Sequence, residues 1–202
     1  MTIRLVLADD QALVRGALAA LLSMESDLEV VAEVGRGDEV VAAVRDHRPD
    51  VVLLDVEMPG LDGISAAAAV RAAGLAARIL IVTTFGRPGY VRRGLQAGAN
   101  GFVVKDTPAR ELADAVRRVH AGLRVIDPTL AVDSMVAGES PLTPREEDVL
   151  REAQRGGSVA DIARALVLSE GTVRNHLSAA IGKTGARNRA EAAQLATENG
   201  WL

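Results

Sequence analysis

Cysteine is absent from this 202-residue chain, and aromatic side chains make up only 2% of it. The lack of cysteine excludes a disulfide framework and a thiolate metal site, and it agrees with a cytosolic setting. With so few aromatic rings, the core must be built from aliphatic side chains, which a hydrophobic content of 49% can supply. The composition therefore predicts a folded, cytoplasmic protein.

Long apolar runs are absent as well, since none approaches the roughly 20 residues that a membrane-spanning helix needs. The first residues, Met1 to Arg4, lead directly into a strand pattern. We therefore expect neither membrane insertion nor a signal peptide.

Basic side chains are also fewer than acidic ones, which gives a net charge of −4. Residues 141–202 carry eight basic and eight acidic side chains, so the whole of this excess lies in residues 1–140. A generally basic coat for nucleic acid is thereby excluded. Within Ser169–Arg189, however, four basic residues face one acidic residue, and such a local patch suits a focused anionic target.

The first 121 residues alternate short apolar runs with segments of helical period. Five such pairs predict an α/β domain with a doubly wound, five-stranded parallel sheet and right-handed crossovers. The expected strands are Ile3–Ala8, Glu29–Val34, Val51–Leu54, Arg78–Thr83 and Gly101–Val104, and the expected helices are Ala12–Ser23, Asp38–Arg45, Ile64–Ala73, Pro88–Ala97 and Pro108–Ala121, the last capped by Thr107.

The pattern changes after residue 121. Residues 122–141 hold two prolines and two glycines and predict a linker, in which Leu130–Val136 forms one or two helical turns. Residues 142–202 predict a small all-α domain. Its four helices are expected to follow caps at Thr143 (a capping box with Glu146), Ser158 (with Asp161), Ser169 and Asn188, the third running from Gly171 to Lys183.

Polar side chains stand where four of the expected strands end: Asp9 and Asp10, Asp55, Thr83 and Lys105. The carboxyl ends of parallel strands meet at one edge of the sheet, where open α/β sheets bind ligands. Crowded carboxylates repel one another unless a divalent cation lies between them, and Mg²⁺ prefers oxygen ligands. Asp55 can then act as a nucleophile toward a phosphoryl group, which Lys105 and Thr83 would stabilise.

Each of these residues also has a simpler explanation. Asp9 and Asp10 would cap the first helix, Asp55 would be an exposed turn residue, and Lys105 a solvated surface lysine. Chance accounts poorly for the placement of all these residues at the strand ends of a single array of parallel strands. We therefore favour the site for a metal ion and a phosphoryl group.

These residues resemble the receiver domain of bacterial response regulators, which has a CheY/flavodoxin-like fold. The resemblance covers residues 1–121 and implies that Asp55 accepts phosphoryl from a sensor histidine kinase. It further implies that Asp10, Asp55 and the backbone carbonyl of Glu57 hold Mg²⁺, with Asp9 acting through water. The matching segments are Asp9-Asp10-Gln11, Leu53 to Gly60, Thr83-Thr84 and Val103 to Asp106.

Thr83 and Phe102 match the switch pair of that family. The resemblance implies that the Thr83 hydroxyl turns toward the phosphoryl group while the Phe102 ring moves inward. Phenylalanine stands where the family often has tyrosine, so no ring hydroxyl is present. Many receivers have a cis proline after the lysine, but Asp106 follows Lys105 here, so we expect no cis peptide at that point.

The second and third expected helices of the C-terminal domain are joined by a tight turn and predict a helix-turn-helix, whose second helix enters the major groove of DNA. The polar side chains of that helix alternate with apolar ones. Arg174 and Asn175 suit guanine and adenine, so they are the predicted base readers. The other predicted DNA-binding residues are Thr172, Ser178, Lys183, Arg187 and Asn188, of which all but Ser178 are placed to contact phosphates. A helical bundle used only for docking stays open as an alternative.

Residues 142–192 also resemble the LuxR-type DNA-binding domain, and with the receiver they place the chain in the NarL/FixJ class of response regulators. The matching text is Leu142 to Glu146, Ile162-Ala163, Leu168 to Leu177 and Arg187 to Ala192. One departure is Gly182 followed, two residues later, by Thr184 in place of a leucine. Since glycine costs about 1 kcal/mol in a helix, we expect the end of the recognition helix to fray.

Two short segments resemble DesR-type regulators more specifically. They are Thr83 to Tyr90 and the tail Glu198 to Leu202. That group responds to membrane fluidity through a membrane histidine kinase and controls a lipid desaturase. The resemblance therefore implies desaturase genes as targets.

The resulting hypothesis is a transcription factor switched by phosphorylation. Phosphoryl transfer to Asp55 would build a homodimer surface, either on the helices expected at 12–23 and 108–121 or on that at 88–97. Two recognition helices would then engage neighbouring half-sites of a double-stranded DNA operator, with RNA polymerase as a further partner.

Three rivals stay open. An aspartyl-phosphate phosphatase or mutase would favour a second aspartate where Glu57 stands, and would need a cap domain. A ligand-sensing LuxR-type regulator would need an apolar pocket, usually rich in aromatic side chains. A receiver that works without phosphorylation would keep its DNA binding after Asp55→Ala.

Overall fold

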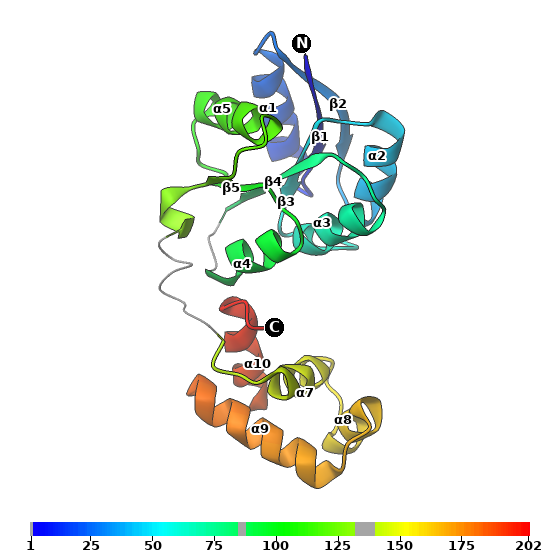
Figure 1. The fold of residues 1–202 in the computed structure, drawn as a ribbon, viewed down its shortest axis with the longest axis vertical. Coiled ribbons are helices and arrows are strands. Elements are labelled where there is room, and N and C mark those ends of the chain that lie inside the picture. Colours follow the sequence, from blue (N-terminus) through cyan, green and yellow to red (C-terminus); the bar gives the residue numbers. More distant parts are fainter. Residues whose placement is uncertain (1, 85–87, 132–139) are drawn as a thin grey trace. The chain divides into compact units, whose positions relative to one another are not determined.

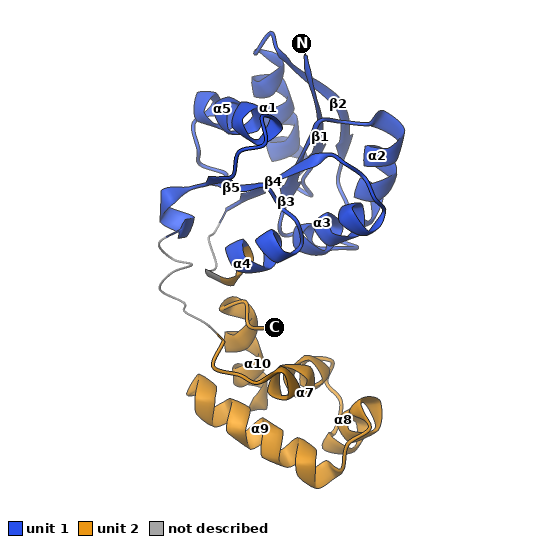
Figure 2. Cartoon of the chain, in the orientation of Figure 1, with its two compact units in different colours: residues 1–86, 91–132 blue, residues 87–90, 133–202 orange. Residues whose placement is uncertain are grey.

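The structure of the protein is a computed structural model that describes residues 2–84, 88–131 and 140–202. The chain divides into two compact units, residues 1–86 with 91–132 and residues 87–90 with 133–202 (Figure 2). The predicted boundaries at 121 and 141 stay a prediction. Each unit is built on its own aliphatic core.

Within the described residues, the first unit contains six parallel strands in the order β2-β1-β3-β4-β5-β6 (Figure 1). Their apolar side chains pack on both faces, and β3 is buried along its whole length. The strands are β1 (Ile3–Ala8), β2 (Leu28–Val34), β3 (Val51–Asp55), β4 (Arg78–Thr83), β5 (Gly101–Val104) and β6 (Val125–Ile126).

Helices cover both faces of this sheet. Figure 1 shows α1 and α5 on one face and α2 and α3 on the other. Aliphatic side chains of α1 and α5 meet Leu7, Leu53 and Leu80 in one buried cluster. The elements are α1 (Ala12–Ser23), the 3₁₀ turn η1 (Gly37–Glu39), α2 (Val40–His47), α3 (Gly63–Ala72), α4 (Pro88–Gln96) and α5 (Ala109–His120).

The prediction of a five-stranded sheet was wrong by one strand, because β6 lies inside the predicted linker. Val125 and Ile126 pair in parallel with Gly101 and Phe102, and Val125 is buried. A two-residue strand is too short to show alternation in a sequence. It forms here because β5 would otherwise expose an unpaired edge.

The start of α5 also differs from the prediction. Pro108, with φ −54° and ψ 142°, is the residue outside the helix, and Thr107 is not its cap. The extended ψ of Pro108 delays the first helical residue to Ala109. The Thr107 hydroxyl is buried and has no hydrogen-bond partner among the described residues.

The second unit is helical where it is described. Its helices enclose a core of aliphatic side chains that includes Leu150, Ile162 and Leu177. The helices are α7 (Pro144–Gln154), α8 (Val159–Leu166), α9 (Glu170–Thr184) and α10 (Arg189–Glu198).

All four predicted caps are present. Thr143 forms a capping box with Glu146, Ser158 forms one with Asp161, and Ser169 accepts from the Thr172 N–H. The Asn188 side chain accepts from the first turn of α10. Local sequence settled these positions because a cap needs only residues three or four apart.

The expected fraying of α9 is not observed. The helix continues to Thr184, whose hydroxyl donates to the Ala180 carbonyl at 2.8 Å. Lys183 is held at its ammonium, 2.7 Å from a carboxylate oxygen of Glu146. Gly185 then ends the helix with a left-handed φ of 68°. These two side-chain contacts offset the weak helix propensity of Gly182.

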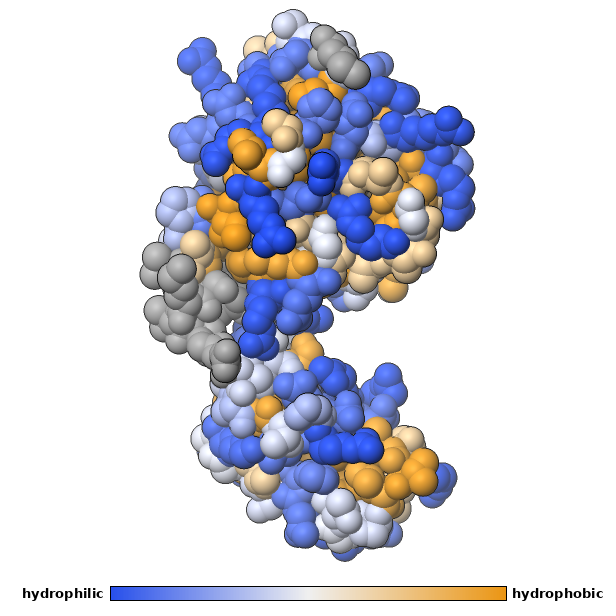
Figure 3. Space-filling view, viewed as in Figure 1, coloured by the Kyte–Doolittle hydropathy of each residue, from blue (hydrophilic) through white to orange (hydrophobic). Residues whose placement is uncertain are grey.

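None of the helices described combines the length and the apolar character that a bilayer-crossing segment would need. Hydrophilic side chains cover most of the face seen in Figure 3, with an apolar patch over the end of α8. The helical turns predicted from Leu130 begin two residues earlier, since residues 128–131 are helical, and Val132–Val136 lie outside the described residues.

Candidate functional site

The predicted site residues gather at one edge of the sheet. β1, β3, β4 and β5 are neighbours and parallel, so their carboxyl ends lie together. Asp9 and Asp10 follow β1, Asp55 ends β3, and Thr83 ends β4. Lys105 follows β5 and is tied to β4, because its N–H donates to the Thr83 carbonyl at 2.7 Å.

Three carboxylates and one ammonium form the centre of this site. One carboxylate oxygen from each of Asp9, Asp10 and Asp55 lies within 4.8 Å of the others. The Lys105 ammonium bridges two of them, 2.8 Å from an oxygen of Asp9 and 2.9 Å from one of Asp55. Asp9 and Asp55 are buried, while Asp10 is exposed at the rim.

The electrostatic balance of this cluster is negative. Burial raises the pKa of the Asp55 carboxyl, and the Lys105 ammonium lowers it by less than burial and Asp9 raise it. Burial also lowers the pKa of Lys105, but its ion pairs with Asp9 and Asp55 outweigh this effect and hold the pKa above its usual value. A single ammonium therefore stays charged without neutralising all of its carboxylate neighbours.

The donor set fits a hard divalent cation. Carboxylate oxygens are the ligands that Mg²⁺ prefers, and the excess negative charge favours a cation. Glu57, whose carbonyl is the further predicted ligand, lies in the loop between β3 and α3. The roles of Asp9, Asp10, Asp55 and the Glu57 carbonyl as metal ligands stay predictions.

Two residues that hold this site in place were not recognised in the sequence. Arg15 on α1 donates to the Asp9 carbonyl at 2.5 Å and lies 3.6 Å from a Glu33 oxygen. Gly63 begins α3 so close to β3 that a β-carbon there would lie 1.9 Å from the Asp55 carbonyl oxygen. Neither contact follows from sequence spacing, because both join separate elements.

The switch pair lies in the core beside the site. Thr83 is buried, and the Phe102 ring is fully buried, so the ring already occupies an inward position. Gly94 on α4 makes room for it, since a β-carbon there would lie 2.2 Å from the Phe102 ring. No cis peptide occurs in the described residues, as we expected after Lys105.

The helix-turn-helix is formed by α8 and α9. On α9, Val173, Leu177 and Ala180 are buried against the core. Of the predicted DNA-contacting side chains on this helix, Thr172 is half-buried and four are exposed: Arg174, Asn175, Ser178 and Lys183. Arg187 and Asn188 are exposed in the turn before α10.

Several of these side chains already have partners within the domain. Arg174 pairs with Glu170 at 2.5 Å, and Arg187 pairs with Glu191 at 3.0 Å. Exposed pairs of this kind are weak enough for a DNA phosphate to replace the carboxylate. Lys183 differs, because its partner Glu146 is buried and is also part of a helix cap.

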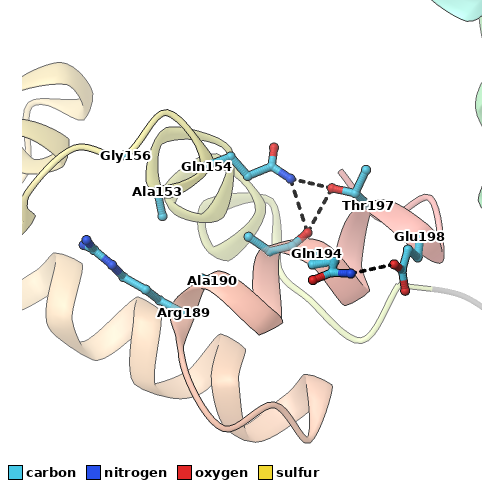
Figure 4. A pocket seen from close by; sticks show the side chains of 9 residues that line it. Ala153, Gln154, Gly156, Arg189, Ala190, Gln194, Thr197 and Glu198 are labelled. Atoms are coloured by element: carbon cyan, nitrogen blue, oxygen red, sulfur yellow. Dashed lines mark hydrogen bonds between the residues drawn. The ribbon is translucent and has the colours of Figure 1, made fainter. Parts of the chain in front are cut away.

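A groove of about 570 Å³ lies between α7 and α10, with a floor of small side chains (Figure 4). Gln154 donates to the Thr197 hydroxyl at 2.5 Å and to the Ala193 carbonyl at 3.3 Å. Gln194 donates to Glu198 at 3.0 Å. These side chains bond across and along the groove and form no cluster of reactive groups.

Known proteins share both parts of this arrangement. Residues 5–117 match the response regulator receiver domain, and residues 140–196 match the bacterial regulatory proteins of the luxR family. The chain therefore belongs to the NarL/LuxR-family two-component response regulators, which are DNA-binding transcription regulators.

Individual relatives match along the whole chain. It is 43% identical to the uncharacterized transcriptional regulatory protein YvfU of Bacillus subtilis (strain 168), over 99% of this chain and 100% of the relative. It is 41% identical to the transcriptional regulatory protein DesR of the same organism, over 99% of both chains. The crystal structure of response regulator ChrA, from a heme-sensing two-component system, is 33% identical with a TM-score of 0.60 and covers 100% of this chain and 99% of its own.

Membership of this family confirms the predicted class and excludes two of the three rivals, while a receiver that works without phosphorylation stays open. The phosphatase alternative is excluded because the family consists of transcription regulators rather than enzymes. A ligand-sensing regulator is excluded because the N-terminal domain is a receiver. The receiver domain also implies a kinase as partner.

Proposed function

We propose that a sensor histidine kinase phosphorylates Asp55, and that phosphorylation promotes dimerisation and operator binding. The observation that carries this proposal is the position of Asp55 at a buried strand end beside Asp9, Asp10 and Lys105. In a family whose regulators work in the cytoplasm with kinase partners, this is the carboxylate best placed to receive a phosphoryl group.

The chemistry follows from the side chains at the site. A carboxylate oxygen of Asp55 forms a bond to phosphorus while the bond between phosphorus and the kinase histidine breaks, and the imidazole nitrogen keeps the electron pair. Lys105 is within reach of the new phosphoryl group, because its ammonium lies 2.9 Å from Asp55. Thr83, at the end of the neighbouring strand, would donate a hydrogen bond to a phosphoryl oxygen.

Mg²⁺ is the proposed metal, held by Asp10, Asp55 and the Glu57 carbonyl, with Asp9 acting through water. When bound, it would neutralise charge on the phosphoryl oxygens. The chain itself keeps the loop of Asp9 in place through Arg15 and excludes water from the buried oxygens of Asp9 and Asp55.

The dimer surface is proposed on α1. This helix and the residue that follows it expose a stripe of apolar side chains, including Leu13 at 87% and Met24 at 81% exposed. Ala17 and Ala20 lie between them at helical spacing and are also exposed. Apolar surface of this kind on a folded domain marks an interaction site, and small residues allow a second helix to approach closely.

DNA recognition is assigned to the exposed face of α9. Arg174 and Asn175 would read base edges in the major groove, and the exposed side chains near them would bind phosphates. In the proposed dimer, two such helices reach neighbouring half-sites. RNA polymerase is the proposed further partner at the promoter.

Phosphoryl labelling tests the proposed acceptor. The protein is incubated with a phosphorylated histidine kinase or with acetyl phosphate in Mg²⁺, and the label on Asp55 is mapped after digestion. We expect Asp55→Asn to lose the label and Asp106→Asn, an exposed carboxylate in the loop after β5, to keep it. A labelled Asp55→Asn protein would contradict the proposal.

Molecular mass tests the proposed dimer. With beryllofluoride as phosphoryl mimic, we expect the wild-type chain to form a dimer in light scattering and Leu13→Asp to remain monomeric. Val167→Asp is the matched control, because Val167 is 90% exposed but lies in the second unit. If Leu13→Asp still forms the dimer, the interface does not lie on this face of α1.

The proposed target genes include a membrane-lipid desaturase. The 41% identity to DesR supports this part of the proposal, together with the matching tail at Glu198–Leu202. A genome-wide binding-site search with the phosphorylated chain would test it. If no binding site lies in a desaturase promoter, this proposed target is wrong.

A further inference from the structure

We infer that β6 is the mechanical connection between the switch residue Phe102 and the chain that leads to the DNA-binding domain. The inference rests on the proposed phosphorylation of Asp55. It concerns what this chain adds to the receiver, namely a sixth strand in the segment that follows α5.

The first observation is the backbone pairing of β6. The Asp127 N–H donates to the Phe102 carbonyl at 2.9 Å, and the Val125 N–H donates to the Asn100 carbonyl at 3.3 Å. In this register Ile126 is the partner of Phe102 itself. The residue predicted to respond to phosphorylation therefore holds the following segment by its own backbone.

The second observation is that Asp127 also begins the next turn. Its carboxylate accepts from the Thr129 N–H at 2.8 Å, and its carbonyl accepts from the Ala131 N–H at 3.0 Å. Leu130 in this turn is buried at 2% exposed. A displacement of Phe102 would thus reach a short rigid piece of chain through Asp127.

The third observation is that the pairing is weakly supported. The strand has two residues, and a cavity of about 260 Å³ lies beside it, lined by Val103, Val125, Ile126 and Pro128. Thr107 also lines this cavity, and its hydroxyl has no hydrogen-bond partner among the residues described. Val125 belongs to the buried core cluster, but Ile126 and Asp127 border the cavity, so this end of β6 can shift while the rest of the sheet keeps its register.

The other end of β5 lies at the phosphorylation site. Lys105 follows β5 directly, contacts Asp55, and is bonded through its N–H to the Thr83 carbonyl. A phosphoryl group on Asp55 changes the position that the Lys105 ammonium prefers, since it brings new negative oxygens. The strand β5 transmits that change to Phe102, and β6 carries it to the helical turn at residues 128–131.

Substitution of Asp127 in the full-length chain tests this connection. Asp127→Pro removes the N–H that bonds to Phe102, and Asp127→Ala is the matched control, because it keeps the N–H and loses only the carboxylate. We measure Asp55 labelling, dimer mass with beryllofluoride, and operator affinity with and without it. Asp127→Pro is expected to label and dimerise like wild type, while its fold-increase in affinity on activation falls to about one and Asp127→Ala keeps most of it.

A wild-type fold-increase in Asp127→Pro would overturn the inference, and so would a loss of affinity that arises only from a lost dimer. If the wild-type chain is not labelled, the proposed function fails instead. Should Asp127→Pro not fold, amide hydrogen exchange of the wild type decides. Beryllofluoride must then change the exchange of the Asp127 N–H but not of the Arg48 N–H, which ends α2; unchanged exchange at Asp127 overturns the inference.

Discussion

A single ammonium shared between two buried carboxylates sets the chemistry of the strand-end site. Lys105 contacts Asp9 and Asp55 at nearly equal distances, so neither carboxylate is fully neutralised. Burial, with a smaller contribution from the Asp9 charge, makes Asp55 costly to ionise when no cation is bound. Stability and function are therefore opposed at this residue.

Asp55→Asn is expected to raise the free energy of unfolding at pH 7 in the absence of Mg²⁺, on the order of 1 kcal/mol. The pKa of Asp55 is raised on folding. The stability that this carboxyl contributes is therefore fully present below the pKa of the unfolded state, and it is lost as the pH rises through the pKa of the folded state. The gain should thus shrink toward pH 4. Urea unfolding of the receiver, followed by circular dichroism, measures this.

Mg²⁺ provides the control for that comparison. It should stabilise the wild type in proportion to the logarithm of its concentration and should stabilise Asp55→Asn much less. An equal stabilisation of both proteins by Mg²⁺ would show that Asp55 is not a ligand of the metal.

Lys183→Met is expected to lower the free energy of unfolding of the second unit by about 1 to 2 kcal/mol, since it leaves Glu146 buried without its ammonium. The estimate is at the lower end because the Lys183 side chain is 37% exposed. Burial raises the pKa of Glu146, but bonds from Lys183 and Thr143 outweigh it and hold the pKa below its usual value. This contribution is complete above the unfolded pKa of Glu146 and is lost as pH falls through the folded one.

Fluorescence of Trp201, the single tryptophan, reports this transition in the full chain because Trp201 packs against the core of the second unit. Lys183→Arg keeps the ion pair and serves as the control. If Lys183→Met lowers DNA affinity but not stability, Lys183 acts as a phosphate contact, as the sequence predicted, and not as a stabilising partner of Glu146.

At the scale of elements, the turn between α8 and α9 contains a strained residue. Val167 adopts the left-handed conformation, with φ 55° and ψ 51°, which costs an L residue about 1 to 2 kcal/mol. Its side chain is 90% exposed, so burial does not repay this strain. The turn is held by its neighbours, since the Leu168 N–H donates to the Ala163 carbonyl at 2.8 Å.

Val167→Asn should therefore stabilise the second unit by about 1 kcal/mol, because asparagine tolerates the left-handed region. Urea unfolding followed by Trp201 fluorescence measures the change. Ala165→Asn, at an exposed position inside α8, should destabilise by roughly half that amount through helix propensity. A destabilised Val167→Asn would show that the valine side chain has a contact that outweighs its strain.

At the scale of the whole molecule, the charges are divided between a negative receiver and a balanced DNA-binding domain. In the part of the second unit that the structure describes, every basic side chain except Arg189 forms an ion pair with a carboxylate. At the predicted contacts Arg174 and Arg187, a DNA phosphate would have to replace the paired carboxylate. Binding should depend steeply on salt, since each phosphate contact releases counterions.

Arg187→Gln is expected to reduce the slope of log affinity against log salt by roughly 2 for a dimer, about 0.9 for each copy. The Arg187 side chain is 86% exposed, so its pair with Glu191 is weak enough to yield to a phosphate. Operator binding by fluorescence anisotropy over a salt series measures the slope. Arg45→Gln, on the exposed face of α2, should leave it unchanged.

The sequence alone determined most of the elements and the chemistry at their ends. The apolar runs of β1 and β3 and the caps at Thr143 and Asn188 were predicted correctly, because each depends on residues close together in the chain. Strand ends also had to converge, since parallel strands share one edge. That rule placed Asp9, Asp55 and Lys105 together before any coordinates were known.

Only the tertiary structure decided the contacts between elements. β6 exists because β5 offers an open edge, Lys183 is bound by a glutamate 37 residues away, and Arg15 reaches the Asp9 carbonyl from another element. No local pattern carries these pairings. They arise when packing brings distant polar groups out of water, where each must find a partner.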